Sequence, residues 1–211
     1  MMKKMISKFG FVAIAILFLM AHFAFKPEGE TVGYKVGDVI KDFKLKGVDG
    51  KYFSIASDLN VKGYVVVFTC NHCPFSVKYE DRIIDINRRY GSQGFPVVAI
   101  NSNDKDIVPE DSYENMIVRA KEKKFSFPYL YDDTQNVAKQ FGATRTPHIF
   151  IVQREKKDLV VKYIGALDNN ADNVEEVSEM YVEAALTELI AGQPVTQAST
   201  KAIGCTIKWK K

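Results

Sequence analysis

Hydrophobic residues follow two different periods along this 211-residue chain, one typical of buried strands and one typical of amphipathic helices. Residues 63–69 and 95–101 are continuous runs of β-branched and aromatic side chains, which is the pattern of strands buried on both faces of a sheet. Between them, Val77, Ile83 and Ile86 recur at helical spacing after Pro74. This strand–helix–strand order predicts a parallel βαβ unit.

The rest of the chain continues the alternation. Two alternating runs on either side of Asp49-Gly50 predict a β-hairpin within residues 37–55. Further helices are expected over 111–124, 134–141 and 173–191, and further strands over 127–131, 148–153 and 159–165, of which the last two form an antiparallel hairpin. The sequence therefore predicts an α/β fold with a central mixed sheet, flanking helices and an N-terminal β-hairpin extension.

The first 25 residues have a different pattern. Lys3, Lys4 and Lys8 precede an apolar run over residues 9–25, as in an export signal or a membrane anchor. A buried N-terminal helix is the alternative. We divide the chain into residues 1–25 (export signal or anchor), 26–36 (linker), 37–192 (the α/β domain) and 193–211 (a C-terminal tail).

The charge balance argues against nucleic acid as a partner. The chain has 29 Lys and Arg against 26 Asp and Glu, and the three N-terminal lysines account for the whole surplus. Nucleic-acid binding requires a clustered excess of basic side chains. Export would place the domain outside the cytoplasm, periplasmic or membrane-anchored, where disulfides persist. Contact with a membrane is then expected through the N-terminal segment, if that segment is not cleaved.

The residues with the clearest chemistry are Cys70-Asn71-His72-Cys73, where a buried strand meets a helix. A thiol at a helix N-terminus is stabilised as the thiolate, which is the nucleophile in disulfide exchange. We expect Cys70 to attack a partner disulfide and Cys73 to resolve the mixed disulfide. His72 is expected to lower the pKa of Cys70 further.

Metal binding is the alternative use of these side chains. Zinc sites usually need a second pair of ligands, and the other candidates here are His148 and Cys205. Cys70, His72 and Cys73 are soft enough ligands for copper carriage. The preferred prediction includes no metal and no cofactor.

A second signal lies in Thr146-Pro147-His148, directly before a predicted buried strand. Proline removes a donor from the sheet ladder, so its place there is unusual. A cis Thr146–Pro147 bond would explain it and would leave the backbone of Thr146 free to pair with an incoming chain. We expect Pro147 beside the cysteines, and Thr146 and His148 among the partner-binding residues. A trans proline that opens the strand is the alternative.

Together these motifs resemble the thioredoxin superfamily over residues 33–192. More narrowly, the chain resembles the peroxiredoxin-like redoxin branch related to the AhpC/TSA family, whose members join a CxxC motif to a peroxiredoxin-type scaffold. Several members end in Gly-Cys-x-Ile-Lys-Trp, as at residues 204–209 here. The resemblance implies a thioredoxin-like fold and redox chemistry at Cys70 and Cys73.

The chain departs from the resembled families in two ways. Peroxiredoxins place a Thr three residues before the peroxidatic Cys, where this chain has Cys70, and Pro147 stands in place of their activating Arg, with Arg145 nearby. Thioredoxins carry a buried Asp in the strand before the motif, and residues 64–69 contain none. Glu80, two helical turns after Cys73, is a candidate for proton transfer; a solvated surface role is the alternative and is preferred.

These observations favour a thiol:disulfide oxidoreductase that exchanges a CxxC dithiol or disulfide with protein partners outside the cytoplasm. Its partners would be proteins with disulfides or dithiols, together with a redox protein that recharges the pair. A thiol peroxidase with antioxidant activity is the alternative enzyme. A thioredoxin-fold carrier of copper or zinc is the non-enzymatic alternative.

The tail contains the third cysteine. Ile203, Ile207 and Trp209 are worth burying, so we expect residues 193–211 to fold back along the domain. Cys205 would then be either a buried inert thiol, which is the preferred expectation, or a third redox thiol beside Cys70 and Cys73.

Overall fold

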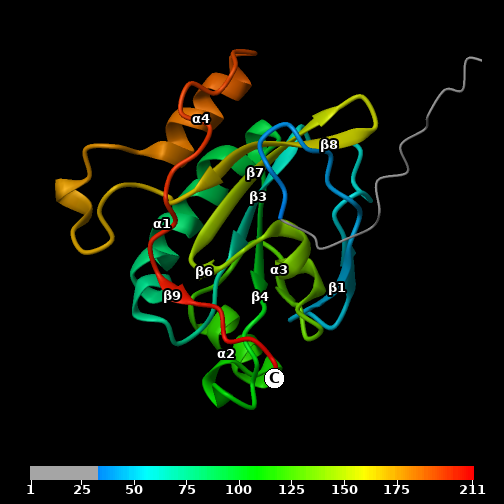
Figure 1. The fold of residues 1–211 in the computed structure, drawn as a ribbon, viewed down its shortest axis with the longest axis vertical. Coiled ribbons are helices and arrows are strands. Elements are labelled where there is room, and N and C mark those ends of the chain that lie inside the picture. The colour runs from blue at the N-terminus through cyan, green and yellow to red at the C-terminus, as the bar shows by residue number, and fades with distance from the viewer. Residues whose placement is uncertain (1–32) are drawn as a thin grey trace, which may run out of the picture.

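A computed structural model describes residues 33–211, so the predicted export segment lies outside the described residues. Its centre is a seven-stranded mixed sheet with the strand order β2-β1-β5-β4-β3-β7-β8 (Figure 1). These strands are β1 (Lys44–Gly47), β2 (Tyr52–Ser54), β3 (Gly63–Phe68), β4 (Val97–Asn101), β5 (Tyr129–Tyr131), β7 (His148–Glu155) and β8 (Asp158–Gly165). The predicted α/β fold with a mixed central sheet is confirmed.

Within residues 33–211, four α-helices flank the sheet, and two short strands form a second sheet beside it. The helices are α1 (Pro74–Tyr90), α2 (Tyr113–Glu122), α3 (Asn136–Phe141) and α4 (Tyr181–Ile190), with 3-10 turns η1 (Gly91–Gln93), η2 (Pro109–Asp111) and η3 (Val174–Glu176). The second sheet pairs β6 (Arg145–Thr146) with β9 (Cys205–Thr206). It therefore joins the tail to the segment just before β7.

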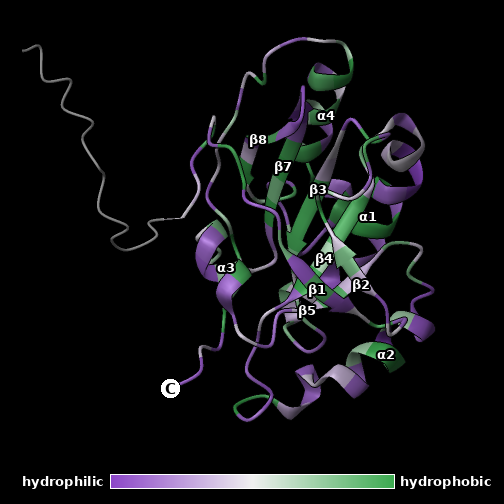
Figure 2. Ribbon diagram, turned by 90° about the vertical axis from the view of Figure 1, so that its right-hand side faces the viewer, coloured by the Kyte–Doolittle hydropathy of each residue, from purple (hydrophilic) through white to green (hydrophobic). Residues whose placement is uncertain are grey.

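The central strands are buried on both faces, as their sequence predicts. Val65 and Val67 of β3 belong to a core cluster shared with α1 and α4, whereas Val66 and Phe68 belong to a cluster on the opposite face with α3. Alternation along a strand sends successive side chains to opposite faces. Figure 2 shows the hydrophobic colour concentrated on β3 and β7 between the helices.

Strand register brings three loops to one edge of the sheet. β3 runs parallel to β4 and antiparallel to β7, with Phe68 beside both Ile100 and His148. The chain therefore leaves β3 and β4 at the edge where it enters β7. The cysteines follow β3 and Pro147 precedes β7, which is why these residues meet.

The N-terminal hairpin has the predicted form. β1 pairs antiparallel with β2, and β1 also pairs antiparallel with β5. Gly50 at the turn has φ +79°, a conformation that glycine adopts at little cost. The hairpin thus extends the sheet beyond its parallel core.

The helix expected over 173–191 is shorter than predicted. The chain forms η3, continues without helix through residues 177–180 and begins α4 only at Tyr181. Asn173 Oδ1 accepts the N–H of Glu175, and Asn169 Oδ1 accepts the N–H groups of Ser178 and Glu179. These side chains satisfy backbone donors locally and so compete with a continuous helix. Val174 and Met180, which lie within the range of the expected helix, are exposed as a result.

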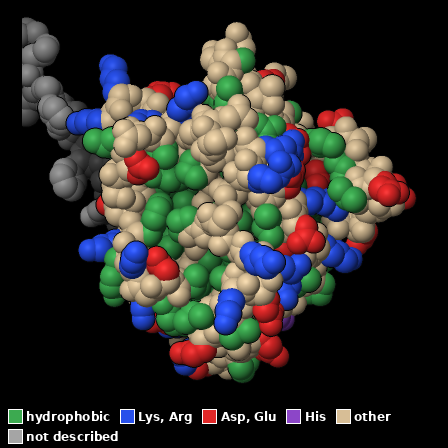
Figure 3. Space-filling model, turned by 180° about the vertical axis from the view of Figure 1, so that it is seen from behind, with side chains coloured by type: hydrophobic (Ala, Val, Ile, Leu, Met, Phe, Trp, Pro, Cys, Tyr) green, Lys and Arg blue, Asp and Glu red, His purple; other side chains and the backbone are tan. Residues whose placement is uncertain are grey.

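The surface shows the expected mixture of charges. On the face seen in Figure 3, basic and acidic side chains are interspersed around patches of apolar atoms. Within residues 33–211, no helix is both long and apolar enough to cross a membrane.

Candidate active site around three cysteines

Helix α1 begins after the second cysteine of the motif. Cys73 is the N-cap residue, with φ −59° and ψ 124°, and Pro74 is the first helical residue. Proline disfavours the helical conformation in the residue before it, so the helix cannot extend back to Cys70. The expectation that Cys70 stands at the helix start is therefore wrong. The positive end of the helix dipole lies at Cys73.

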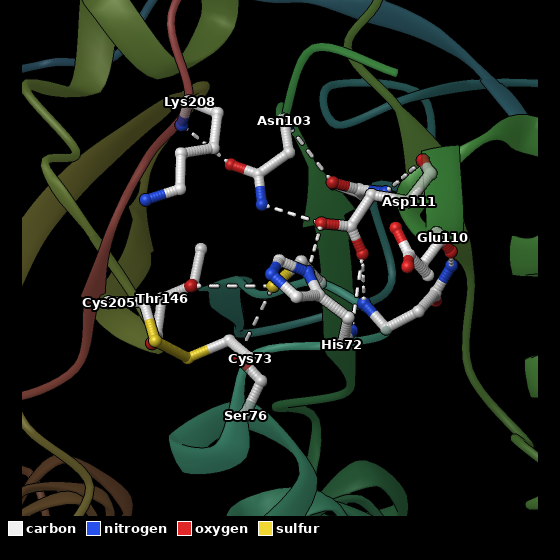
Figure 4. Close-up of polar contacts among 12 residues, drawn as sticks. His72, Cys73, Ser76, Asn103, Glu110, Asp111, Thr146, Cys205 and Lys208 are labelled. Carbon is white, nitrogen blue, oxygen red and sulfur yellow. Dashed lines mark hydrogen bonds and ion pairs between the residues drawn. A yellow bond between two sulfur atoms is a disulfide. The ribbon is translucent and has the colours of Figure 1, made fainter. Parts of the chain in front are cut away.

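The disulfide in this structure joins Cys73 to Cys205, not to Cys70. The two Cα atoms are 6.2 Å apart, although 132 residues separate them in the sequence. Cys70 is the free cysteine of the three. Figure 4 shows the bond at the start of α1, with the tail on its far side. The preferred expectation of an inert Cys205 is thus wrong, because the fold-back of the tail brings Cys205 onto Cys73.

Cys70 lies in an enclosed polar environment behind this bond. Cys70 is 2% exposed, and its Sγ lies 3.4 Å from Thr146 Oγ1 and 3.8 Å from Ser76 Oγ. Burial raises the pKa of the Cys70 thiol, and the nearby Asp111 carboxylate raises it further. This corrects the expectation of a lowered pKa, which assumed a helix N-terminus at Cys70.

Asp111 fixes the loop that carries the motif. The residue is fully buried, and its Oδ1 accepts the backbone N–H groups of Asn71 and His72 at 2.7 and 3.2 Å. Its Oδ2 lies 2.7 Å from His72 Nδ1 and accepts a hydrogen bond from Asn103 Nδ2 at 2.7 Å. Four partners on one carboxylate offset the cost of its burial. Figure 4 shows Asp111 between His72 and Asn103.

His72 is close to Cys70 but directs its Nδ1 towards Asp111. One ligand atom from each of Cys70, His72 and Asp111 lies within 4.8 Å of the others, so a three-ligand metal group is geometrically conceivable. Both oxygens of Asp111 already accept hydrogen bonds, however, and the disulfide removes Cys73 from the set of soft ligands expected for copper. The arrangement fits loop positioning better than metal binding.

Asn71 attaches the motif loop to β5 and η2. It accepts a hydrogen bond from the hydroxyl of Tyr129 at 2.9 Å and donates one to the Glu110 carbonyl at 2.8 Å. Tyr129 is buried, and burial raises its pKa well above the ordinary value, so the phenol remains a donor. The loop between the two motif cysteines is therefore held on both sides.

The predicted cis bond at Thr146–Pro147 is confirmed, and it faces the disulfide. Cys73 Sγ lies 3.3 Å from the carbonyl oxygen of Thr146. Thr146 pairs with Cys205 and Arg145 with Thr206 in the antiparallel β6–β9 ladder. The backbone expected to meet an incoming partner thus meets the protein's own tail.

Cys73, Thr146 and Pro147 form the groove that β9 occupies, whereas the His148 side chain packs into the core. The residue is 8% exposed, its ring lies against Phe150, and Nδ1 accepts the N–H of Thr144 at 3.4 Å. Burial lowers the pKa of His148 to about 4, so the imidazole is neutral at pH 7. In this state it supports the turn before Pro147 from inside, and its predicted contact with a partner stays a prediction.

Glu80 is not the solvated side chain that was preferred from the sequence. It is 4% exposed, and its two oxygens accept hydrogen bonds from Arg119 Nε and Nη2 at 2.7 and 2.6 Å. Glu80 and Cys70 both line a small cavity of about 10 Å³. The carboxylate is nevertheless committed to an ion pair, and its role in proton transfer stays a prediction.

The tail contributes a second row of contacts. Ile207 is 3% exposed and donates its N–H to the Thr144 carbonyl at 3.1 Å, and Trp209 packs against the same core cluster. Lys208 donates its N–H to Asn103 Oδ1 at 2.8 Å. Ile203 is 47% exposed, so the expectation that it is buried is wrong.

Sequence reasoning missed Asp111, Asn103 and Gln135 as parts of the site. Gln135 donates to the carbonyls of Ser102 and Lys208 and so holds the tail against the loop after β4. One signal was available, because the polar run 101–104 follows a buried strand parallel to the strand before Cys70. Loops after neighbouring parallel strands meet at one edge of a sheet.

Comparison with solved structures finds two similar proteins without a stated function. An uncharacterized conserved protein from Geobacillus kaustophilus is 39% identical, with a TM-score of 0.76 over 86% of this chain and 95% of that chain. A hypothetical protein from Sinorhizobium meliloti 1021 is 34% identical, with a TM-score of 0.77 over 86% of this chain and 98% of that chain.

A more distant likeness concerns the fold alone. A peroxidoxin, BcpB, from Mycobacterium tuberculosis is 20% identical, with a TM-score of 0.54 over 74% of this chain and 97% of that chain. No curated protein matches the sequence. Residues 36–163 match the AhpC/TSA family. The site therefore lies in a thioredoxin-like redox scaffold with a general oxidoreductase role, and the chain belongs to the AhpC/TSA family.

Proposed function

We propose that the protein is a thiol:disulfide oxidoreductase that exchanges disulfides with protein partners outside the cytoplasm. The observation that carries the proposal is the disulfide from Cys73 to a strand paired with Thr146, the residue before the cis proline. An extended segment with a cysteine fits this groove and forms a bond to the motif there. A disulfide-bearing partner could enter in the same way.

The geometry favours Cys73 as the thiol that bonds to the partner and Cys70 as the resolving thiol. Cys73 lies at the N-terminus of α1 and beside the groove, whereas Cys70 lies behind it with a raised pKa. This order reverses the one expected from the sequence. In the reduced protein, the Cys73 thiolate attacks a partner disulfide and one partner thiolate leaves. Cys70 then attacks Cys73 Sγ, a Cys70–Cys73 disulfide forms, and the second partner thiolate leaves with a proton from solvent.

The reverse sequence oxidises a partner dithiol, and a separate redox protein recharges the pair in either direction. The location follows from the basic and apolar start of the chain, which has the pattern of an export signal or anchor. Attachment to a membrane through that segment is part of the proposal if the segment is retained. Neither a metal nor a cofactor is required for the exchange.

Peroxidase chemistry is the alternative to be tested alongside, because the chain belongs to the AhpC/TSA family. Arg145, the arginine near the expected activating position, donates Nη1 to the Gly204 carbonyl at 3.0 Å, which engages it with the tail. This contact favours disulfide exchange as the main activity.

The test measures insulin disulfide reduction by the full chain with dithiothreitol as the electron source, and hydrogen peroxide consumption in parallel. Cys73→Ser should reduce insulin no faster than the uncatalysed reaction. In a Cys205→Ser background and without dithiothreitol, Cys70→Ser should accumulate a mixed disulfide on Cys73, because no thiol is then left to resolve it. The proposal fails if the wild type does not accelerate insulin reduction, or if it consumes peroxide far faster than it reduces insulin. More trapping by Cys73→Ser than by Cys70→Ser would restore the order expected from the sequence.

A further inference from the structure

The tail strand β9 occupies the place that the proposed function assigns to a partner. It is antiparallel to β6, with Cys205 opposite Thr146 and Thr206 opposite Arg145. Its cysteine is bonded to Cys73, which is 0% exposed beneath it. A partner strand that meets Thr146 and Cys73 must therefore displace residues 204–207 first.

The groove selects particular side chains at successive positions of the tail. A Cβ on Gly204 would lie 2.2 Å from the Thr146 carbonyl oxygen, so only glycine fits before the cysteine. Thr206 after the cysteine is exposed, and Ile207 is buried in the apolar cluster beside Thr144. The pattern accepted by the groove is thus glycine, cysteine, a free position and an aliphatic residue.

Hydrogen bonds to the backbone of the tail continue beyond Ile207. The Asp104 N–H and Gln135 Nε2 both donate to the Lys208 carbonyl, at 2.9 and 2.8 Å. Lys210 donates its N–H to Gln135 Oε1 at 2.8 Å. Main-chain contacts of this kind bind an extended segment whatever its side chains, so they would hold a partner strand equally well.

We propose that residues 204–207 are a resident substitute for a partner strand, that Cys205 is a third exchange thiol, and that partners present a Gly-Cys-x-aliphatic segment in extended form. This inference rests on the proposed function. The tail covers the oxidised site and leaves when the bond to Cys73 is transferred.

The transfer involves no net oxidation. The Cys70 thiolate attacks Cys73 Sγ, the Cys70–Cys73 bond forms as the Cys73–Cys205 bond breaks, and Cys205 leaves as a thiolate. The proton lost by Cys70 is balanced by the proton that Cys205 takes up from solvent. Cys70 Sγ contacts Thr146 Oγ1 and Cys73 Sγ contacts the Thr146 carbonyl oxygen, so both sulfur atoms lie beside the same residue.

The tail can be displaced without touching a sulfur atom. Gly204→Val should push β9 away from Thr146, and Ile207→Asp should do so from its other end; Lys201→Ala at an exposed tail position is the matched control. Trp209 is the single tryptophan of the chain and reports on tail position by its fluorescence. Mass mapping of the oxidised full chain should find Cys73–Cys205 in the wild type and Lys201→Ala, and Cys70–Cys73 with red-shifted Trp209 emission in both displaced variants.

The partner pattern is tested with Cys73 as the sole thiol. In a Cys70→Ser/Cys205→Ser chain, an octapeptide with the sequence of residues 202–209, activated as a mixed disulfide with thionitrobenzoate, should label Cys73 at least about tenfold faster when Gly204→Val is added, because the groove is vacated. The same peptide with valine before its cysteine should lose most of that gain.

The two proposals fail in different ways. Equal labelling with and without Gly204→Val, and an unchanged Cys73–Cys205 bond in both displaced variants, would overturn the resident tail even if insulin is reduced. A bond that shifts to Cys70–Cys73 on tail displacement, in a chain that reduces no insulin, would support the relay and overturn the proposed function. Equal labelling by the glycine and valine peptides would overturn the partner pattern.

Discussion

Cys70 and Cys73 are three residues apart in one motif, yet their sulfurs have different surroundings. Cys73 is the N-cap of α1 and is bonded to a strand in the groove beside Pro147. Cys70 lies among hydroxyl groups, near the Asp111 carboxylate, and burial raises the pKa of its thiol. The comparison shows that the helix start, which Pro74 determines, places Cys73 and not Cys70 at the positive end of the helix dipole.

The largest expected effect contrasts the two cysteines in stability under oxidising conditions. Cys73→Ser removes a bond that closes a loop of 132 residues, and we expect it to cost about 4 kcal/mol of unfolding free energy. Cys70→Ser breaks no bond and should cost about 1 kcal/mol. Urea unfolding of the two variants measures the difference, and Cys205→Ser should match Cys73→Ser. Equal losses at positions 70 and 73 would mean that the disulfide is not the resting bond.

A second test asks whether Glu80, one of the two carboxylates near Cys70, has a role beyond its ion pair with Arg119. Glu80→Gln breaks a buried ion pair with Arg119 and should lower stability by about 3 kcal/mol. If Glu80 acts only through this pair, the pH profile of insulin reduction should keep its shape. The neighbouring Asp81→Asn, at an exposed position, is the control. A shifted profile with Glu80→Gln alone would assign it the proton-transfer role.

Asp111→Asn should remove one of the features that distinguish the surroundings of the Cys70 thiol from those of Cys73. The Asp111 carboxylate is the second cause of the raised pKa of Cys70, so its neutralisation should lower that pKa and speed alkylation of Cys70 several-fold. Oxidised protein is suited to the measurement because Cys70 is then its free thiol. Thiolate absorbance against pH gives the value, with Asp168→Asn, another buried carboxylate, as control. An unchanged titration would show that burial alone sets the pKa.

The smallest expected effect concerns His148, the buried residue that follows Pro147. Burial lowers the pKa of His148 from 6.5 to about 4, so below pH 6.5 the unfolded chain binds a proton that the folded protein does not. Stability should therefore fall as pH drops from 6.5 towards 4, by about 1 kcal/mol between pH 7 and 5.5. Unfolding of wild type and His148→Gln at both pH values isolates this contribution. The same pH dependence in both would contradict a buried neutral imidazole.

The sequence predicted the parts of the fold that depend on local pattern. The β-branched runs before Cys70 and after residue 95 became β3 and β4, and Asp49-Gly50 became the hairpin turn. The Cys73-Pro74 dipeptide also marks the helix start, which leaves Cys70 outside the helix. The break before α4 was less accessible, because it depends on Asn169 and Asn173 accepting backbone donors in a particular loop geometry.

Only those features of the site that depend on a single local motif could be predicted from the sequence. The cis bond before Pro147 followed from the proximity of a proline to a buried strand and a CxxC motif. The contact of Asp111 with the motif and the bond of Cys205 to Cys73 depend on sheet order and on the path of a polar tail. Nothing in the spacing of residues encodes such long-range contacts, so the role of each cysteine could be assigned only from the fold.

The bond between Cys73 and Cys205 can form only late in the synthesis of the chain. During synthesis, Cys70 and Cys73 and every strand of the large sheet are complete before Cys205 is added. Until then, the motif cysteines can pair only with each other or with a foreign thiol. A chain interrupted before residue 205 would retain an open, reactive groove. Covering of the groove by β9 therefore requires translation through residue 206.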